Sequence, residues 1–527
     1  MLLPTRTPVP FPMTNSQAVT RAKVSASALV LAGLALLLHA VVGLETPYGF
    51  HRDEFLYIAM GTHLRILHMD FPPMIALLSN VVRALAGSSL FAYRMVPALF
   101  GTGLLVLAVS TARAMGGGPT AQVLTAIAVL FNPLFLRAAT LFQPVVLDQF
   151  WWMLGFYALV RLGHADERRW WLLLGVAGGL GLLSKFSILF FGLSVLIGLL
   201  ISRRRALVTA GPWMALGVAL LLGAPSIIGQ VALGWPLFDQ MAGLRQGQLG
   251  RITLGGYVLE QLTWGPVSFA LAVAGATALL RRPSLQRFRV TGWAAVAAFI
   301  LYAITRGKPY YVGPIYPMLF AAGGVWVEQI ARPKVRAGLA WGAATLIVVT
   351  GVLALPFGVP FLAPASMARY AAASGVSSGV QTNRGVLLSL PQDYADMLGW
   401  REKAEAVAAV YAKLPAAERA EAVIYASNYG QAGSLEFYGR ELRLPPVVSL
   451  AGSFYLFGPG TRPGRTIILV GVPREKVRGI SCETLDDAGR VGNRWGVPEE
   501  RDVPILLCRH PNLTLQELWR ARGPQWG

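Results

Sequence analysis

Four polar residues stand in a row soon after the first long apolar stretch of the sequence. They are His51, Arg52, Asp53 and Glu54. A carboxylate in this position could be a general base that removes the proton of an acceptor hydroxyl. We therefore take Asp53 and Glu54 as candidate catalytic residues, and His51 and Arg52 as candidate substrate-binding residues. The alternative is an ordinary wet loop with a local ion pair.

Two further aspartates have unusual surroundings. Asp70 precedes the paired Pro72 and Pro73, which fix the chain and suit the start of a helix. It is a candidate substrate-binding residue, or part of a simple turn. Asp148 lies in an apolar run, where an ionisable residue is a functional hypothesis by default. We expect it on the same membrane side as Asp53, as a catalytic residue or as an interfacial carboxylate in water.

Cations occur at two other boundaries between apolar segments. One is Lys185, and the other is the run that contains Arg306, Lys308, Tyr310 and Tyr311. Cations held at the outer face beside tyrosines suit a phosphate or pyrophosphate head group, and ordinary snorkelling anchors are the alternative. Carboxylates that activate an acceptor, with cations that bind a phosphate leaving group, predict transfer from a lipid phosphate at the outer leaflet.

Long apolar segments must position these residues. The chain of 527 residues is 54% hydrophobic and only 14% charged, whereas a soluble domain has about a quarter charged residues. A spanning helix needs roughly 20 apolar residues, and the sequence predicts about eleven of them. Their approximate bounds are 24–44, 90–114, 119–137, 141–161, 170–184, 186–201, 208–229, 264–280, 290–305, 310–329 and 337–356.

Short basic clusters between the apolar segments predict the orientation. The clusters at 203–205, 281–289 and 332–336 all fall on one side when the N-terminus is cytoplasmic, as in other membrane proteins. The net charge of +20 is spread over these clusters and not over one stripe, which argues against a nucleic-acid partner. The loop at 45–89 and everything after about 357 then lie on the outer side.

The predicted fold class is mainly α, with a polytopic bundle followed by a small α/β domain. The predicted parts are a cytoplasmic tail at 1–23, a transmembrane catalytic domain at 24–356 and a periplasmic C-terminal domain at 357–527. Short apolar runs at 423–425, 466–470 and 504–507 predict buried strands in this last domain. Cys482 and Cys508 could form a disulfide there, since a bacterial periplasm is oxidising, or stay unpaired.

Taken in order, these motifs resemble the bacterial branch of the protein O-mannosyltransferase-like family. Its members have the GT-C fold and are related to family 39 glycosyltransferases and to the aminoarabinose transferase that modifies lipid A. The resemblance covers about residues 25–330, and two tail motifs extend it. It is carried by His51-Arg52-Asp53-Glu54, Asp70-Phe71-Pro72-Pro73, Asp148, Lys185-Phe186-Ser187, the run Arg306 to Tyr311, Pro314, Tyr316-Pro317, the run Pro391 to Trp400 and the run Asn428 to Gly433.

The resemblance implies an inverting glycosyltransferase in the bacterial inner membrane. Such an enzyme takes a sugar from a polyprenyl-phosphate donor at the periplasmic face, and here the acceptor is left open as a lipid, a glycan or a protein. Asp53 becomes the leading candidate for the base. Lys185, Arg306 and Lys308 would face the lipid phosphate.

A divalent metal ion, Mg²⁺ or Mn²⁺, is also implied by the resemblance. Its ligands would be acidic residues, with Asp53 and Asp148 as the main candidates and Glu54 beside them. The sequence departs from the family at Val146, where relatives often carry a small polar residue. The segment from Asn428 to Gly433 is either a turn into a helix that touches substrate or a feature of the fold.

Two other functions are weighed against transfer. A transporter or flippase of a lipid-linked sugar would have charged residues along a midplane path and internal repeats; no repeat is seen, and the ionisable groups gather at one face. A non-catalytic member whose tail binds a partner fits poorly, because Asp53 is intact. The enzyme hypothesis requires Asp53 and Lys185 to lie at the same end of the bundle.

Overall fold

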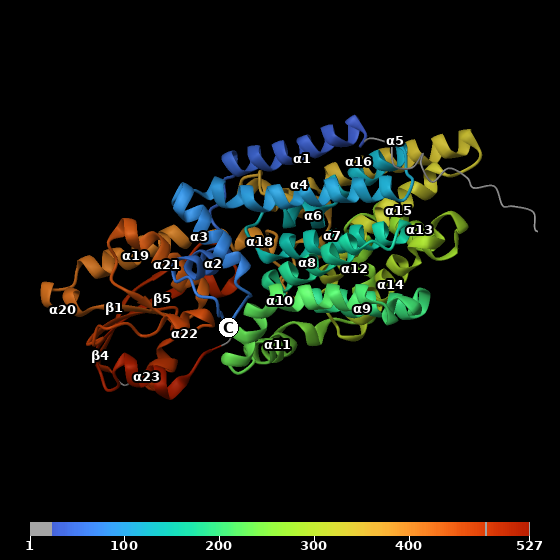
Figure 1. Cartoon of the computed structure of the whole chain (residues 1–527). Coiled ribbons are helices and arrows are strands. Elements are labelled where there is room, and N and C mark those ends of the chain that lie inside the picture. Colours follow the sequence, from blue (N-terminus) through green and yellow to red (C-terminus); the bar gives the residue numbers. More distant parts are fainter. Residues whose placement is uncertain (1–23, 480–481, 526–527) are drawn as a thin grey trace, which may run out of the picture.

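The computed structural model of the chain has a long helical bundle with a small α/β domain at one end (Figure 1). It describes residues 24–479 and 482–525. The predicted cytoplasmic tail at 1–23 lies outside the described residues. The mainly helical, polytopic fold with a C-terminal sheet domain is confirmed.

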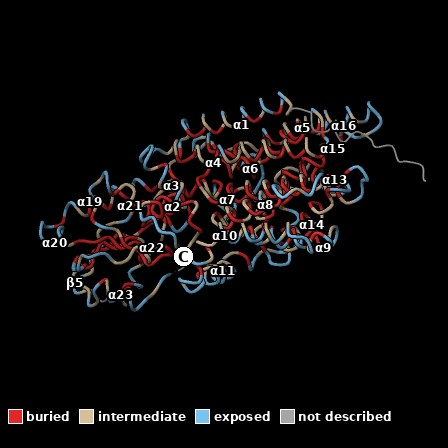
Figure 2. The backbone as a smooth tube through the Cα atoms, viewed as in Figure 1, coloured by how far each residue is buried: buried red, intermediate tan, exposed pale blue. Residues whose placement is uncertain are grey.

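Six helices in the described part of the chain are long and apolar enough to cross a membrane, or seven spans if one bent pair counts as a span. The six are α1 (Ala26–Glu45), α4 (Leu90–Ala114), α7 (Pro144–His164), α10 (Ala210–Ala232), α14 (Arg289–Ile304) with η3 (Pro283–Phe288) before it, and α16 (Pro333–Gly358). Leu34 and Leu37 of α1 and Leu346 and Leu353 of α16 are exposed, and Figure 2 shows the exposed sides of these helices. Such apolar surface suits lipid and not water.

Shorter helices occupy the remaining predicted spans. They are α5 (Pro119–Leu130), α6 (Pro133–Ala138), α8 (Arg168–Ser184), α9 (Ile188–Ser202), α15 (Tyr316–Glu328) and the bent pair of α12 (Leu254–Thr263) and α13 (Pro266–Arg281), which meet at 109°. The single span predicted at 119–137 is two helices. Asn132 caps α6 by accepting from Leu134 N, and Pro133 cannot extend the hydrogen bonding of α5.

The basic loops lie together at the end of the bundle away from the sheet (Figure 1). Arg203, after α9, forms an ion pair of 3.0 Å with Asp166, before α8. Ser284, after α13, donates a hydrogen bond of 2.8 Å to Gln329, after α15. Loops that the charge pattern assigns to one side are therefore in contact.

A five-stranded sheet forms the centre of the C-terminal domain, in the order β2-β1-β3-β5-β4. The strands are β1 (Val423–Ala426), β2 (Val447–Val448), β3 (Thr466–Val470), β4 (Cys482–Val491) and β5 (Val503–Pro511). β1 is parallel to β2 and to β3, while β5 is antiparallel to both β3 and β4. The three strands predicted from apolar runs correspond to β1, β3 and β5.

The two faces of this sheet pack against different helices. Ile424 and Ile468 belong to the large core shared with the bundle, on the side of α19 (Trp400–Ala412) and α21 (Tyr429–Leu442). Tyr425 and Leu469 belong to a second core with Leu518 of α23 (Leu515–Arg522). Alternate residues of a strand point to opposite faces, so β1 and β3 join the two cores.

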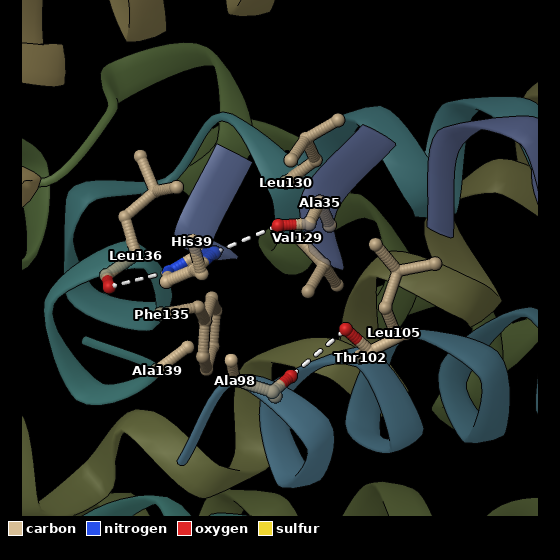
Figure 3. A pocket seen from close by; sticks show the side chains of 11 residues that line it. Ala35, His39, Ala98, Thr102, Leu105, Val129, Leu130, Phe135, Leu136 and Ala139 are labelled. Atoms are coloured by element: carbon tan, nitrogen blue, oxygen red, sulfur yellow. Dashed lines mark hydrogen bonds between the residues drawn. The ribbon is translucent and has the colours of Figure 1, made fainter. Parts of the chain in front are cut away.

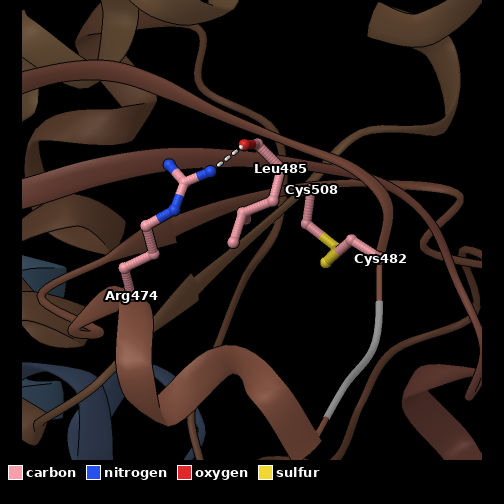
Figure 4. The surroundings of a disulfide bond; sticks show 4 residues. All are labelled: Arg474, Cys482, Leu485 and Cys508. Atoms are coloured by element: carbon pink, nitrogen blue, oxygen red, sulfur yellow. Dashed lines mark hydrogen bonds between the residues drawn. A yellow bond between two sulfur atoms is a disulfide. The ribbon is translucent and has the colours of Figure 1, made fainter.

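Cys482 and Cys508 form a disulfide between the edge strand β4 and its neighbour β5 (Figure 4). Their Cα atoms are 5.5 Å apart, within the usual range. Arg474 donates a hydrogen bond of 2.9 Å to the carbonyl oxygen of Leu485 nearby. The crosslink and this bond fix the outer strand of the domain.

His39 fastens the first helix to the bundle (Figure 3). Its buried ring contacts the carbonyl oxygens of Ala35 at 2.8 Å and Leu136 at 3.1 Å. The cavity beside it holds about 20 Å³, about one water. This histidine is therefore a satisfied core residue.

Two helices of the predicted outer loop join the bundle to the C-terminal domain. α2 (Arg52–Thr62) and α3 (Met74–Ala86) lie between them. Phe55 of α2 contacts the rings of Trp400, Phe437 and Tyr438 at centroid distances of 5.6–5.9 Å. The C-terminal domain is thus docked on the segment that holds Asp53.

Candidate active site

Asp53 stands in the first turn of α2, and the sequence explains why the helix starts there. His51 Nδ1 accepts from the Asp53 amide at 3.0 Å, and the Glu54 carboxylate accepts from the His51 amide at 2.6 Å. This reciprocal pair is a capping box in which histidine takes the place of serine. The row of polar residues is therefore a helix start that also presents a carboxylate.

Three segments meet at the Asp53 carboxylate. The Tyr429 hydroxyl, from α21, donates to Asp53 Oδ1 at 2.8 Å, and the Gln143 amide, just before α7, donates to Oδ2 at 3.1 Å. The side chain of Asp53 is still 30% exposed. An oriented and accessible carboxylate is what a general base requires.

The adjacent Glu54 has a different environment. Its side chain is fully buried, and Oε1 accepts from the Phe142 amide at 2.9 Å. Its other oxygen also faces Arg94 of α4 at 3.4 Å. Glu54 therefore connects α2 to α4 and to the turn before α7, and its predicted catalytic role stays a prediction.

Two carboxylates of the C-terminal region surround His51. His51 Nε2 lies 3.8 Å from Asp393 and 4.0 Å from Asp396, and Nδ1 is used by the helix cap, so the ring proton belongs on Nε2. Burial raises the pKa of Asp396 to about 6. Burial also acts to raise the pKa of Asp393, but Arg137 and His51 together outweigh this effect and lower the pKa.

Sequence reasoning did not choose Asp393, Asp396, Gln143 or Tyr429 as site residues. The two aspartates lie in a tail motif that carried only the resemblance to the family, and Tyr429 lies in the segment that we read either as a turn into a helix that touches substrate or as a feature of the fold. Tyr429 and Asp53 are 376 positions apart, so no local pattern could join them. A signal for the aspartates was present in their i, i+3 spacing after Pro391.

Arg52 and Asp70 face the C-terminal domain. The Arg52 guanidinium lies 4.8 Å from the centre of the Tyr429 ring and 3.3 Å from Glu499. Asp70 accepts from the Ser453 amide at 2.6 Å, at the start of α22 (Ser453–Phe457). Both residues hold the two parts of the chain together, and their predicted roles in substrate binding stay predictions.

The predicted cations and tyrosines come together at this end of the bundle. Lys185 Nζ, between α8 and α9, lies 4.8 Å from the centre of the Tyr311 ring and 5.9 Å from that of Tyr310. Lys308 Nζ lies 5.9 Å from the Tyr310 ring. Arg306 is exposed and has a positive φ of 53°, and it stands apart from this aromatic pair.

Lys308 connects the cations to the carboxylates. Burial is the main cause that lowers the pKa of Lys308 to about 8; Asp53 opposes this shift, Lys185 adds to it, and Asp393 opposes it. Asp53, Asp393 and Lys185 are therefore each close enough to Lys308 to influence its charge. Asp53 and Lys185 lie at the same end of the bundle, as the enzyme hypothesis requires.

Asp148 occupies the second turn of α7 and is buried. Its neighbours are Lys185, Ser187 and Trp152, whereas Asp53 has Gln143 and Tyr429 beside it. Asp148 is thus an acidic neighbour of Lys185, and its predicted catalytic role stays a prediction.

The residues do not form an obvious metal centre. In 24–479 and 482–525, no group of three or more His, Cys, Asp or Glu side chains is placed to hold a metal ion. The oxygens of Asp53 already accept from Tyr429 and Gln143. Metal binding by Asp53 and Asp148 stays a prediction, and no step below uses it.

The chain is a polytopic membrane protein, and its bundle with a docked C-terminal domain has the GT-C fold. Residues 70–228 match the family described as dolichyl-phosphate-mannose-protein mannosyltransferase. This stretch contains Asp70, Asp148 and Lys185. No curated protein matches the chain in sequence.

Solved structures share this fold over most of the chain. ArnT from Cupriavidus metallidurans, bound to undecaprenyl phosphate, is 17% identical, with a TM-score of 0.62 over 92% of this chain and 98% of that one. The apo form of the same protein has a TM-score of 0.60 and is 17% identical, over 91% of this chain and 97% of that one. A third similar structure is the archaeal oligosaccharyltransferase AglB from Archaeoglobus fulgidus, in complex with an inhibitory peptide and a dolichol-phosphate. Its TM-score is 0.50 and it is 11% identical, over 85% of this chain and 69% of that one. The predicted GT-C fold is confirmed.

Proposed function

We propose that the chain is an inverting glycosyltransferase that moves a sugar from a polyprenyl-phosphate donor to a hydroxyl of a cell-envelope acceptor. One observation carries the proposal: an accessible carboxylate, Asp53, shares one end of the bundle with Lys185 and Lys308 beside two tyrosine rings. The acceptor is a lipid, a glycan or a protein. The GT-C fold and the undecaprenyl phosphate bound to ArnT support a lipid-linked donor.

In the proposed reaction, Asp53 takes the proton of the acceptor hydroxyl. The acceptor oxygen then forms a bond to the anomeric carbon as the bond from that carbon to the phosphate oxygen breaks. The polyprenyl phosphate leaves with the electron pair. A single displacement of this kind inverts the anomeric carbon. Tyr429 and Gln143 hold the Asp53 carboxylate in one orientation, which lowers the entropic part of the barrier.

Lys185 and Lys308 suit the leaving phosphate because, in the part of the chain that the structure describes, neither ammonium forms an ion pair of 4.0 Å or less with a carboxylate. Ammonium groups over aromatic faces are held in place electrostatically, and a phosphate that gains negative charge forms stronger hydrogen bonds to them. Asp148 balances Lys185 when no donor is bound. Stabilisation of charge that develops in the transition state is usually the largest single contribution to catalysis.

We place the enzyme in the bacterial inner membrane, with the N-terminus in the cytoplasm and the C-terminal domain in the periplasm. The basic loops at one end of the bundle support this orientation, and the disulfide in the C-terminal domain suits an oxidising compartment.

Asp53→Asn tests the role of the base. The protein, reconstituted in lipid, is mixed with undecaprenyl-phosphate sugars and an envelope extract from a strain that lacks the chain, and released undecaprenyl phosphate is measured. We expect the variant to lose at least about 100-fold in rate, since an amide cannot accept the proton. Asp502→Asn, which changes an exposed aspartate paired with Arg490, is the matched control.

Two results would contradict the proposal. A variant at position 53 with more than a tenth of the normal rate would remove Asp53 as the base. Movement of intact labelled donor across the bilayer, with no cleavage by the wild-type protein, would favour the flippase alternative.

A further inference from the structure

A cavity of about 340 Å³ opens at one end of the sheet in the C-terminal domain. Ser427, directly after β1, and Gly471, directly after β3, form its floor, and Leu450 and Leu518 line its wall. Ligand sites of proteins commonly have volumes of about 300–1,000 Å³. This cavity is therefore large enough for a small organic molecule.

The position of the cavity in the sheet is a typical binding position. From β1 the chain crosses through α21 to its neighbour β2 on one side, and from β2 it returns through α22 to β3 on the other side of β1. The connections thus diverge between β1 and β3. In open parallel sheets, ligands bind outside the carboxyl ends of the strands at this switch point.

Two residues shape the backbone beside the cavity. Gly471 has a φ of 73°, which favours glycine, and a Cβ at this position would collide with the side chain of Gln431 of α21, outside the lining. Gln525 closes one side of the cavity, where its amide donates 2.7 Å to the carbonyl oxygen of Leu450.

The charge of the cavity is positive. Lys476 precedes β4 and Arg522 ends α23, and both are exposed at the rim. Within residues 24–479 and 482–525, neither cation has a carboxylate partner in an ion pair, and the cavity lining contains no acidic residue. Tyr425 and Ser427 also line the cavity, and the Ser427 hydroxyl donates a hydrogen bond of 3.0 Å to the side chain of Gln431.

We propose that this cavity binds a small anionic ligand, a phosphate or carboxylate group carried on a body the size of one sugar, with Lys476 and Arg522 on the anion and the leucines against the body. The site is separate from Asp53, since the β1–α21 turn directs Tyr429 to that carboxylate while the cavity opens on the α23 face of the sheet. It does not rest on the proposed transfer reaction. The anion is a soluble sugar phosphate or the head group of an anionic envelope lipid.

Binding to the full-length protein in nanodiscs of phosphatidylcholine tests the site without any turnover. Glucose 1-phosphate is the probe in isothermal titration calorimetry, and glucose is the neutral comparison. We expect glucose 1-phosphate to bind and glucose to bind at least about tenfold more weakly, because the cations supply charge-assisted hydrogen bonds. Lys476→Gln and Arg522→Gln should each weaken binding about tenfold or more.

Arg520→Gln is the matched control, because Arg520 lies on the same helix, is exposed and is not part of the lining. A second set of nanodiscs that contain phosphatidylglycerol distinguishes a lipid head group from a soluble anion. If this lipid weakens the binding of glucose 1-phosphate, the site binds a head group; if the affinity for glucose 1-phosphate is unchanged, the site binds a soluble anion. Equal binding of glucose and glucose 1-phosphate, no binding of glucose 1-phosphate, or full binding by a variant that combines Lys476→Gln with Arg522→Gln would overturn the proposal.

Discussion

At the scale of single residues, Asp53 and Glu54 show how neighbours in the sequence receive different surroundings. Successive helix residues point about 100° apart, so one carboxylate turns to the interior and the other to the site. Glu54 is enclosed by two backbone amides and Arg94. Asp53 keeps an exposed edge. The sequence predicts the pair of acids, but it does not reveal which of them is accessible.

Tyr429→Phe should lower kcat about 10- to 100-fold and leave the KM for the donor nearly unchanged. The change removes the hydrogen bond from the Tyr429 hydroxyl to the Asp53 carboxylate, and a hydrogen bond to a charged group is worth about 1.5–3 kcal/mol. It does not alter the groups that we expect to bind the phosphate of the donor. Steady-state kinetics in reconstituted lipid would measure both constants. Tyr438→Phe, on the same helix, is the control, and equal kcat values for the two variants would contradict a positioning role for Tyr429.

The pKa of the Lys308 ammonium predicts the pH above which the activity falls. Its pKa is about 8, so the ammonium is present below this pH and is lost as the pH rises through it. We expect kcat/KM, which reports on the free enzyme, to fall above pH 8. Lys308→Arg should carry activity to higher pH, because arginine stays charged. Lys413→Arg, an exposed change, should leave the profile unchanged, and an identical limit in both variants would exclude Lys308.

At the scale of elements, close contact between α2 and α21 builds the site. A Cβ at Gly433 would lie 2.8 Å from the Phe55 Cβ and 2.9 Å from its carbonyl. The glycine allows the two helices to approach, and Tyr429 reaches Asp53 one turn away. The motif from Asn428 to Gly433 is thus both a helix start and part of the site.

Gly433→Ala should destabilise the protein by about 1–3 kcal/mol through overpacking, although alanine alone favours a helix by about 1 kcal/mol. Thermal unfolding in detergent would show a lower midpoint, and activity should fall with it as α21 moves away from α2. Gly342→Ala on α16, where nothing lies within 4 Å, should be neutral or slightly stabilising. A stabilised Gly433→Ala protein would contradict the close packing.

Local patterns predicted most elements because each depends on nearby residues. Long apolar segments predicted the membrane helices, and short apolar runs predicted β1, β3 and β5. The break at Asn132 and Pro133 was missed, since an apolar run hides a cap that lies within it. The contacts of His51 with Asp393 and Asp396 depend on docking across the whole chain, and no spacing rule reports them.

At the scale of the whole molecule, the separation of charge along the long axis links the parts. Asp53, Lys185 and Lys308 lie at the end of the bundle where the C-terminal domain is docked, and the basic loops lie at the other end (Figure 1). The site thus has the ends of apolar helices on one side and a folded domain on the other. This arrangement suits a substrate whose tail stays in the membrane while its head group reacts outside it.

The same separation gives a test of orientation in cells. Both cysteines of the chain are in the disulfide. A single introduced cysteine is therefore the thiol that reacts with a membrane-impermeant maleimide. Ser377→Cys, exposed beside the C-terminal domain, should be labelled in intact spheroplasts. Ser284→Cys, exposed in a basic loop, should be labelled only after permeabilisation, because basic loops stay cytoplasmic. The reverse pattern would place the site in the cytoplasm, where a donor at the periplasmic leaflet could not reach Asp53.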